Sequence, residues 1–522
     1  MIRSPVPLGL LALLTACSAE NSFGFQADAA ADDTAWYAGE DEGDGLWDTG
    51  ADDADTYEPE SESDFLKLAP AATDVYVFVA NPARDTVTRV GVPSLAVITA
   101  EVGVDPEVVR TTEDYSMAVT FNAGSDSVSI IDSATLAVTN VDVRPNLNTM
   151  KMSPDGAWVI CYHDQAGEDY DSDNGGVTSF NEVSLVHLAS ATSYAEVVGF
   201  NPRDVQFTSD SRLAVVVSDA YLGVIDLTSG DTHPMRIALT EETVDPPEAE
   251  EVLLSQDGSF AFVRQFGAPG LLVVDLAAGT VQVVDVGDSP TDLDLTPDGK
   301  RAVAVARGAN QLWIYDMEDP FETPEILDMP EGEVLGSVLM SPDNTRGLLY
   351  STASGVSHIS EWDIPTGRFT TYGLVKPIST IGIAADGGTA LIFHDIDNGD
   401  VDRDSVFYNH YGLTLVDLAD FFQSALLLPA EPKAYANSDE GDIGYFIMEG
   451  QPYLEVLNYG SLLYDEVPLK SDPVHVGVLP ESRLAYVNQE HDLGRLSFYD
   501  PDAEELQTLT GFELNSAIEH ED

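Results

Sequence analysis

The sequence predicts an all-β protein built from repeated four-stranded sheets that close into a ring, a β-propeller. The clearest repeat runs from Pro290 to Asp316, where two strands with alternating side chains flank the turn Pro297-Asp298-Gly299 and a third strand follows. The Asp-Gly pair tolerates the positive φ of a tight hairpin turn. One such sheet cannot bury both of its faces alone, so copies must stack against one another.

Ten copies of this repeat follow Phe65, at a mean spacing of about 45 residues, which is within the range of propeller blades. The strand after the turn is predicted at Val75–Ala80, Ser116–Phe121, Trp158–Tyr162, Leu213–Val217, Phe260–Val263, Arg301–Ala306, Gly347–Tyr350, Thr389–Phe393, Ile443–Ile447 and Leu484–Asn488. No segment has the pattern of a long amphipathic helix.

The sequence also has a second repeat that is several blades long. The pairs His163-Asp164 and His394-Asp395 occupy the same place in their blades, and Pro145 and Pro377 recur at nearly the same separation. We interpret residues 65–522 as a five-blade block copied once, about 65–289 and 290–522. We expect one ring of ten blades, with two five-bladed rings as the alternative. In the single ring, Phe512–Ile518 would pair with Val75–Ala80 and leave no exposed edge.

The composition is strongly acidic, with 91 Asp and Glu against 22 Lys and Arg and a formal net charge of -69. Binding to nucleic acid requires basic surface and is excluded. Such a surface suits salty surroundings; the alternative is a surface that attracts cations or a basic partner. Two cysteines, Cys17 and Cys161, rule out a disulfide framework.

The N-terminus has the features of an export signal. Residues 1–16 combine Arg3 with an apolar run, and Leu14-Thr15-Ala16-Cys17 resembles a bacterial lipobox. The resemblance implies a diacylglycerol on Cys17. It also implies an outer-membrane or cell-surface address in a Gram-negative bacterium, because Ser18 is not the aspartate of inner-membrane retention. The alternative is an ordinary signal peptide. Residues 17–64 are acidic and poor in apolar residues, which predicts a disordered tether.

Several motifs resemble the surface-layer-type YVTN propeller repeats and, more loosely, WD-repeat and lactonase-type propellers. They are Tyr76-Val-Phe-Val-Ala-Asn81, Val128-Ser-Ile-Ile-Asp132, Ser153-Pro-Asp-Gly156, Thr296-Pro-Asp-Gly299 and Tyr486-Val-Asn488. The resemblance covers most of residues 74–522 and implies the propeller fold. It implies little about activity, because propellers host many functions. Rings of seven blades are common in these families, so ten copies is a departure.

Two acidic insertions, Gly167–Gly176 and Asp395–Asp404, follow the two His-Asp pairs. Clustered carboxylates with Asn and Gly match the oxygen ligands that Ca²⁺ requires. Solvated loops are the alternative, and the spacing is not that of an EF-hand. The candidate calcium ligands are Asp169, Asp171, Asp173, Asp395, Asp397, Asp400, Asp402 and Asp404.

His163 and His394 are the remaining candidate site residues. A histidine beside an aspartate at a strand end is consistent with a catalytic or metal dyad. Its appearance at two symmetric places favours a hydrogen bond that packs the blade. The sequence has no Gly-x-Ser-x-Gly, His-Glu-x-x-His, Cys-x-x-Cys or phosphate-loop motif. We therefore assign no catalytic residue.

Together these features favour a lipid-anchored envelope protein whose propeller binds a protein, a glycan or another envelope component. The alternative is a metal-dependent hydrolase or lactonase-like enzyme. That enzyme would need His, Glu and Asn residues to converge on one rim.

The lipobox generates the first prediction. Replacing Cys17 with Ala removes the only group that can accept the diacylglycerol at the cleavage site, so the Cys17→Ala chain should leave the membrane fraction. Phase partitioning in detergent measures this, with Cys161→Ala as the control that should stay in the detergent phase. Partitioning of Cys17→Ala into detergent like the wild type would contradict the lipid anchor.

Overall fold

The computed structural model describes residues 71–164, 181–240, 249–265, 268, 270–288, 290–353, 355–396, 398–399, 401–438, 440–491, 493–511 and 519–521. The predicted signal peptide, Cys17, the tether at 17–64 and the segment 512–518 lie outside these residues. The candidate ligands Asp169, Asp171, Asp173, Asp397 and Asp400 lie outside them as well.

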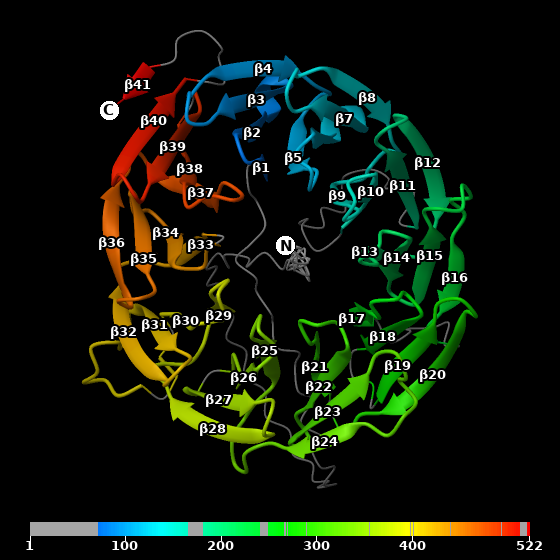
Figure 1. Cartoon of the computed structure of the whole chain (residues 1–522), viewed down its shortest axis with the longest axis vertical. Helices are drawn as coiled ribbons and strands as arrows, with labels where there is room; N and C mark the ends of the chain where they lie inside the picture. The colour runs from blue at the N-terminus through cyan, green and yellow to red at the C-terminus, as the bar shows by residue number, and fades with distance from the viewer. Residues whose placement is uncertain are drawn as a thin grey trace, which may run out of the picture.

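Ten antiparallel sheets are arranged around a ring, one after another along the chain (Figure 1). The first five blades contain β1 (Ala71–Ala72), β2 (Tyr76–Asn81), β3 (Thr86–Gly91), β4 (Val97–Glu101); β5 (Pro106–Thr111), β6 (Met117–Asn122), β7 (Ser127–Asp132), β8 (Val138–Asp142); β9 (Thr149–Met152), β10 (Trp158–Tyr162), β11 (Glu182–His187), β12 (Thr192–Val197); β13 (Pro202–Phe207), β14 (Leu213–Ser218), β15 (Tyr221–Asp226), β16 (Met235–Ala238); and β17 (Ala249–Leu254), β18 (Phe260–Gln265), β19 (Gly270–Asp275), β20 (Thr280–Asp285).

The last five blades contain β21 (Pro290–Leu295), β22 (Arg301–Ala306), β23 (Gln311–Asp316), β24 (Glu325–Asp328); β25 (Ser337–Met340), β26 (Arg346–Tyr350), β27 (His358–Asp363), β28 (Arg368–Gly373); β29 (Thr380–Ile383), β30 (Thr389–His394), β31 (Tyr411–Asp417), β32 (Phe422–Leu428); β33 (Pro432–Asn437), β34 (Ile443–Met448), β35 (Tyr453–Asn458), β36 (Leu463–Pro468); and β37 (Pro473–Val478), β38 (Ala485–Gln489), β39 (Arg495–Asp500), β40 (Glu505–Thr510), β41 (Glu519–Glu521). Two short 3₁₀ helices, η1 (Pro82–Arg84) and η2 (Ala123–Ser125), complete the elements in the described ranges.

The single ten-bladed ring predicted from the repeats is confirmed. Each predicted second strand lies within two residues of the observed one, and Arg301–Ala306 coincides with β22. Propellers typically have about four to eight blades, so this ring is large for its class.

The second strand of a blade is mostly apolar because it is buried on both faces. In β22, Ala302 and Ala304 pack towards the blade before it, whereas Val303 and Val305 pack towards the blade after it. Successive side chains of a strand point to opposite faces, so one strand contributes to two junctions. A fully apolar strand of this kind requires a neighbour on each side.

Ten hydrophobic clusters fill the ten junctions between neighbouring blades. One cluster joins the fifth blade to the sixth, which excludes two separate five-bladed rings. Another joins the last blade to the first, with Val77 and Val79 packed against Tyr486 and Leu496. Face-to-face packing therefore closes the circle.

The pairing predicted for the closing strand is wrong, because Val75–Ala80 already has an inner partner. Ala71 and Ala72 of β1 pair with Phe78 and Val77 and occupy the inner edge of β2 there. At the other end of the chain, β41 adds a fifth, outer strand to the last blade by pairing with β40. Closure needs no shared strand because the apolar faces of the first and last blades already pack together.

The strand order gives the ring two different faces. We call the side that carries the loops between second and third strands, and the connections between blades, the connection face. The opposite side carries the turns between first and second strands and between third and fourth strands, and we call it the turn face. The second acidic insertion belongs to the connection face, because it follows β30, the second strand of the eighth blade; the first, Gly167–Gly176, lies outside the described residues.

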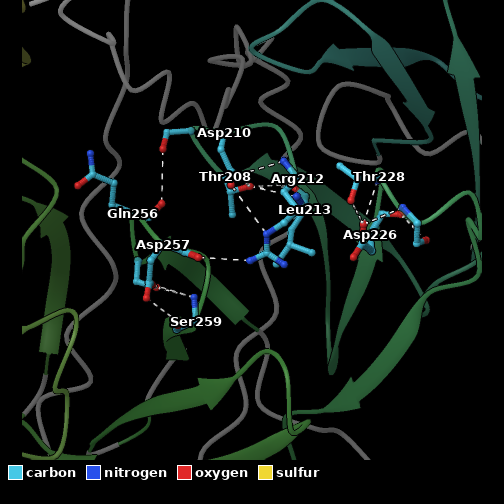
Figure 2. Close-up of polar contacts among 12 residues, drawn as sticks. Thr208, Asp210, Arg212, Leu213, Asp226, Thr228, Gln256, Asp257 and Ser259 are labelled. Carbon is cyan, nitrogen blue, oxygen red and sulfur yellow. Dashed lines mark hydrogen bonds and ion pairs between the residues drawn. The ribbon is translucent and has the colours of Figure 1, made fainter.

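Aspartates on the turn face hold the turns closed. Figure 2 shows Thr208, whose hydroxyl donates to Asp210 Oδ1 at 2.6 Å and accepts from the backbone N–H of Leu213 at 3.0 Å. The guanidinium of Arg212 reaches the neighbouring blade, where it donates to the carbonyl of Asp257 at 3.3 Å. Ser or Thr followed two residues later by Asp forms the same bond at Thr112, Ser153, Ser255, Thr296 and Ser341.

These contacts give many of the acidic residues a structural role. The Thr208 hydroxyl lowers the pKa of Asp210 below its usual value, and the Ser259 hydroxyl does so for Asp257. A carboxyl group whose pKa is lower in the folded than in the unfolded chain stabilises the fold above its usual pKa, and this stabilisation is lost as the pH falls. The acidic composition is therefore partly a requirement of the turns.

The ninth blade contains a buried carboxyl group that breaks a local pattern. In the adjacent blades, the equivalent third-strand residues are Thr414 and Ser497. Their hydroxyls form hydrogen bonds with His394 and Thr508. The matching residue of β35 is Glu455, which is 1% exposed, and neither of its carboxyl oxygens has a hydrogen-bond partner within the described ranges. It lies opposite Phe446 on the face that packs against the eighth blade. Burial, with a contribution from Glu466, raises its pKa to about 8.

Glu455 generates the second prediction. Because its pKa is raised from 4.5 to about 8, the folded chain holds a proton that the unfolded chain has released, and stability should fall as the pH rises between these values. The Glu455→Gln chain should lose this pH dependence and melt at a higher temperature than the wild type at pH 9, with little gain at pH 5. Differential scanning calorimetry measures this, and the exposed Glu505→Gln is the matched control. Equal melting curves for Glu455→Gln and Glu505→Gln at pH 9 would contradict the buried charge.

Candidate functional site

His394 lies inside the eighth blade and bridges two segments. Its Nδ1 is 2.8 Å from the carbonyl oxygen of Pro377, and its Nε2 is 2.8 Å from the hydroxyl of Thr414. A carbonyl can only accept, so Nδ1 carries the proton and Nε2 accepts from the hydroxyl. Burial, with a contribution from the charge of Lys376, lowers the pKa of His394 to about 4. The ring is therefore neutral at neutral pH.

The same polar contact recurs in other blades with different residues. The last residue of the second strand donates to a hydroxyl on the third strand from Asn81 to Thr88 at 2.8 Å, from Asn122 to Ser129 at 2.9 Å and from Gln489 to Ser497 at 2.5 Å. His394 occupies this position and bonds to Thr414 with the direction reversed, because its Nε2 accepts from the hydroxyl. The arrangement is that of a hydrogen bond within the blade, with both ring nitrogens already engaged.

His163 follows β10 in the third blade and is 7% exposed. The residue beside it is held by a reciprocal pair of bonds, in which Asp164 N donates to Asn148 Oδ1 and Asn148 Nδ2 donates to Asp164 O, both at 2.7 Å. The two histidines are five blades apart, so the structure does not bring them together.

The loop between β30 and β31, which contains the second insertion, is tied to its surroundings by several hydrogen bonds. The ammonium of Lys376, which is fully buried, donates to the carbonyl of His410 at 2.8 Å. Asn398 and Asn409 bond to each other through Asn398 Nδ2 to Asn409 Oδ1 at 2.5 Å and Asn409 N to Asn398 Oδ1 at 2.6 Å. A Cβ atom at Gly399 would lie 2.7 Å from Pro377 Cγ, so only glycine fits there.

The described carboxylates of this insertion do not form a metal cluster. Asp395 Oδ1 accepts from Ile396 N, and Asp402 Oδ1 accepts from Asp404 N at 3.0 Å. No group of three or more His, Cys, Asp or Glu residues suited to a metal ion occurs within the ranges that the structure describes. Calcium binding by the insertions stays a prediction, because Asp397, Asp400 and the whole first group of ligands are outside those ranges.

A pocket of about 520 Å³ lies between the third and fourth blades, at the connection face. We call it the blade 3–4 pocket. It is lined by Asn181, Val197, Val198, Gly199, Phe200, Tyr221, Pro234 and Arg236. Its volume falls within the range of about 300–1,000 Å³ that is typical of small-molecule sites. Asn181 is the first described residue after the segment that contains the first insertion.

Two glycines let the connection between these blades lie close to the third strand. A Cβ atom at Gly199 would be 2.9 Å from Tyr221 Cβ, and one at Gly223 would be 3.0 Å from Val198 Cγ1. This approach places Phe200 beside the start of β15, where Tyr221 begins the strand. Both rings remain open to solvent, with Phe200 60% and Tyr221 40% exposed.

Sequence reasoning missed this pocket. Its residues come from four separate segments, and none of them belongs to a known motif. A usable signal was the aromatic residue directly after glycine in a blade connection, Gly199-Phe200. A second, smaller pocket of about 360 Å³ lies at the connection between the sixth and seventh blades, and its lining of Arg307, Asn310 and residues 331–335 contains no aromatic ring.

Comparison with known proteins gives no family. No family model matches the chain, and no curated protein matches it. Similar solved structures include hydrazine synthase from Kuenenia stuttgartiensis (18% identity, TM-score 0.31, covering 58% of this chain and 94% of that one). They also include the dihydro-heme d1 dehydrogenase NirN in complex with DHE (16% identity, TM-score 0.44, covering 69% of this chain and 74% of that one). A third is a eukaryotic initiation factor (12% identity, TM-score 0.49, covering 74% of this chain and 95% of that one). These likenesses carry no argument about function, and the ten-bladed ring rests on the strand pairing itself.

A search of the described segments for a helix of sufficient length and hydrophobicity to span a bilayer finds none.

The acidic insertions generate the third prediction. A ligand that binds the native state stabilises it by mass action, so added Ca²⁺ should raise the melting temperature relative to chelator. The double variant Asp402→Asn, Asp404→Asn should reduce this rise, whereas Asp319→Asn on the turn face should leave it unchanged. Thermal melts with Ca²⁺, with Mg²⁺ and with chelator make the measurement. Identical wild-type melts with chelator and Ca²⁺ would count against the site.

Proposed function

We propose that this chain is a lipid-anchored envelope protein whose propeller is a binding module rather than an enzyme. The observation that carries the proposal is the blade 3–4 pocket, where two solvent-exposed aromatic rings and a few polar side chains converge at the edge of the connection face. Exposed aromatic groups beside polar ones are typical of recognition surfaces. The candidate histidine His394 favours the same reading, because both of its ring nitrogens are engaged in hydrogen bonds.

The anchor in this proposal is the lipid on Cys17, with residues 17–64 as the tether. The resemblance to a lipobox and to YVTN-type repeats of surface proteins supports an address at the outer membrane or the cell surface. The topology adds a directional argument. The strand β1 leads into the turn between Ala72 and Tyr76 on the turn face, so the described chain enters the first blade from the connection-face side.

The fourth prediction tests binding without interference from the lipid. The Cys17→Ala chain, which lacks the lipid acceptor, should co-sediment with outer-membrane or cell-wall fractions prepared from the same cells. The double variant Phe200→Ala, Tyr221→Ala should reduce the bound fraction several-fold, because truncating central aromatic residues removes a large share of binding energy.

The matched control is Phe422→Ala in the eighth blade, because Phe422 is 62% exposed and Phe200 is 60% exposed. This control should bind like the parent chain. Equal co-sedimentation of the pocket variant and the Phe422→Ala control would contradict the assignment of binding to this pocket.

A further inference from the structure

We propose that the blade 3–4 pocket recognises a pyranose ring that carries a carboxylate, such as a uronic acid, either free or as a unit of a polysaccharide. The inference rests on the proposed function and names the ligand class of the same pocket. It stands on two features: an arginine without an ion pair in the described part of the chain and two exposed aromatic rings.

Arg236 is the first feature. It is exposed at the pocket on β16 and forms no ion pair or side-chain hydrogen bond in the described part of the chain. In this protein acids outnumber bases 91 to 22, and other arginines, such as Arg144 and Arg203, are paired with carboxylates. A guanidinium presents a rigid fork of donors that matches the two oxygens of a carboxylate.

The register of the sheet points Arg236 into the pocket. Arg236 pairs with Gly223 in β15, and the absent side chain of Gly223 faces Val198 in the blade connection. Ile237, the next residue, packs instead into the cluster shared with the fifth blade. Alternate residues of a strand face opposite sides, so Arg236 faces the third blade and the pocket.

The aromatic rings are the second feature. Phe200 and Tyr221 line the same pocket and retain large exposed fractions, 60% and 40%. The C–H groups on one face of a pyranose pack well against an aromatic ring, while its hydroxyls seek polar partners around the rim. The amide of Asn181 lies in that rim. A wholly apolar ligand would leave the guanidinium without a partner, which costs binding energy.

The net charge of -69 does not oppose this ligand at short range. Exposed charges further away than about 8 Å are largely screened at physiological ionic strength. The charged side chain in the lining is Arg236, so the local interaction decides which ligand charge is accepted. A cationic ligand would be repelled by the guanidinium at contact distance.

The fifth prediction compares a carboxylated oligosaccharide with its neutral counterpart. Tetragalacturonate should bind to the purified full chain, as measured by isothermal titration calorimetry, and its fully methyl-esterified form should bind at least about tenfold more weakly, because it loses the charge-assisted hydrogen bonds. Free galacturonate serves as the second arm: binding of the monomer indicates recognition of the single unit, and binding of the tetramer alone indicates recognition within a polymer.

The variants separate the two features of the pocket. Arg236→Gln should weaken tetragalacturonate about tenfold while leaving the ester unchanged, and Phe200→Ala should weaken both. Arg368→Gln and Phe422→Ala, exposed residues in other blades, are the matched controls and should change neither. Equal affinities for acid and ester, an Arg236→Gln chain that binds like the wild type, or no binding of either ligand at millimolar concentration would overturn the proposal.

The outcome can be distinguished from failure of the proposed function. If the pocket variants abolish co-sedimentation with the envelope but tetragalacturonate does not bind, the pocket is a binding site and the ligand class is wrong. If neither the envelope nor the sugars respond to the pocket variants, both proposals fail.

Discussion

The structure depends on the requirement that each blade be covered on both faces. A four-stranded sheet with an apolar second strand has two faces to bury, and ten interblade clusters do so around the ring. The free energy gained scales with the apolar area removed from water, so a ring with no terminal face is favoured over an open stack. The packing of Val77 and Val79 against Tyr486 and Leu496 satisfies this requirement where the first and last blades meet.

This requirement explains what could be predicted from the sequence. A strand buried on both faces is a short apolar run bounded by turn residues, and Arg301–Ala306 after Pro297-Asp298-Gly299 is such a run. Closure was mispredicted because it involves no such pattern. Ala71–Ala72 is too short to be recognised, and the sequence of Glu519–Glu521, which pairs with Thr508–Thr510, has no alternation of apolar and polar residues.

The candidate site was less predictable for a related reason. The residues that recur from blade to blade are those that stabilise the blades. They include His394, which the sequence offered as a candidate catalytic residue. His394 occupies the position that the carboxamides Asn81, Asn122 and Gln489 fill in other blades, so the imidazole was a poor guide to its function. The pocket residues Asn181, Phe200, Tyr221 and Arg236 are brought together only by the packing of one blade against the next.

The difference between the two faces of the ring explains which parts of this protein tolerate sequence change. The turn face is constrained, because its aspartates bond the turns and link adjacent blades, as Arg212 does with Asp257. The connection face carries the insertion of the eighth blade and the blade 3–4 pocket, and its loops can change without disturbing the interblade clusters. Because the strands are packed on both faces and the turns are held by hydrogen bonds, sequence change is best tolerated in the loops of the connection face. The binding that we propose lies on the same face.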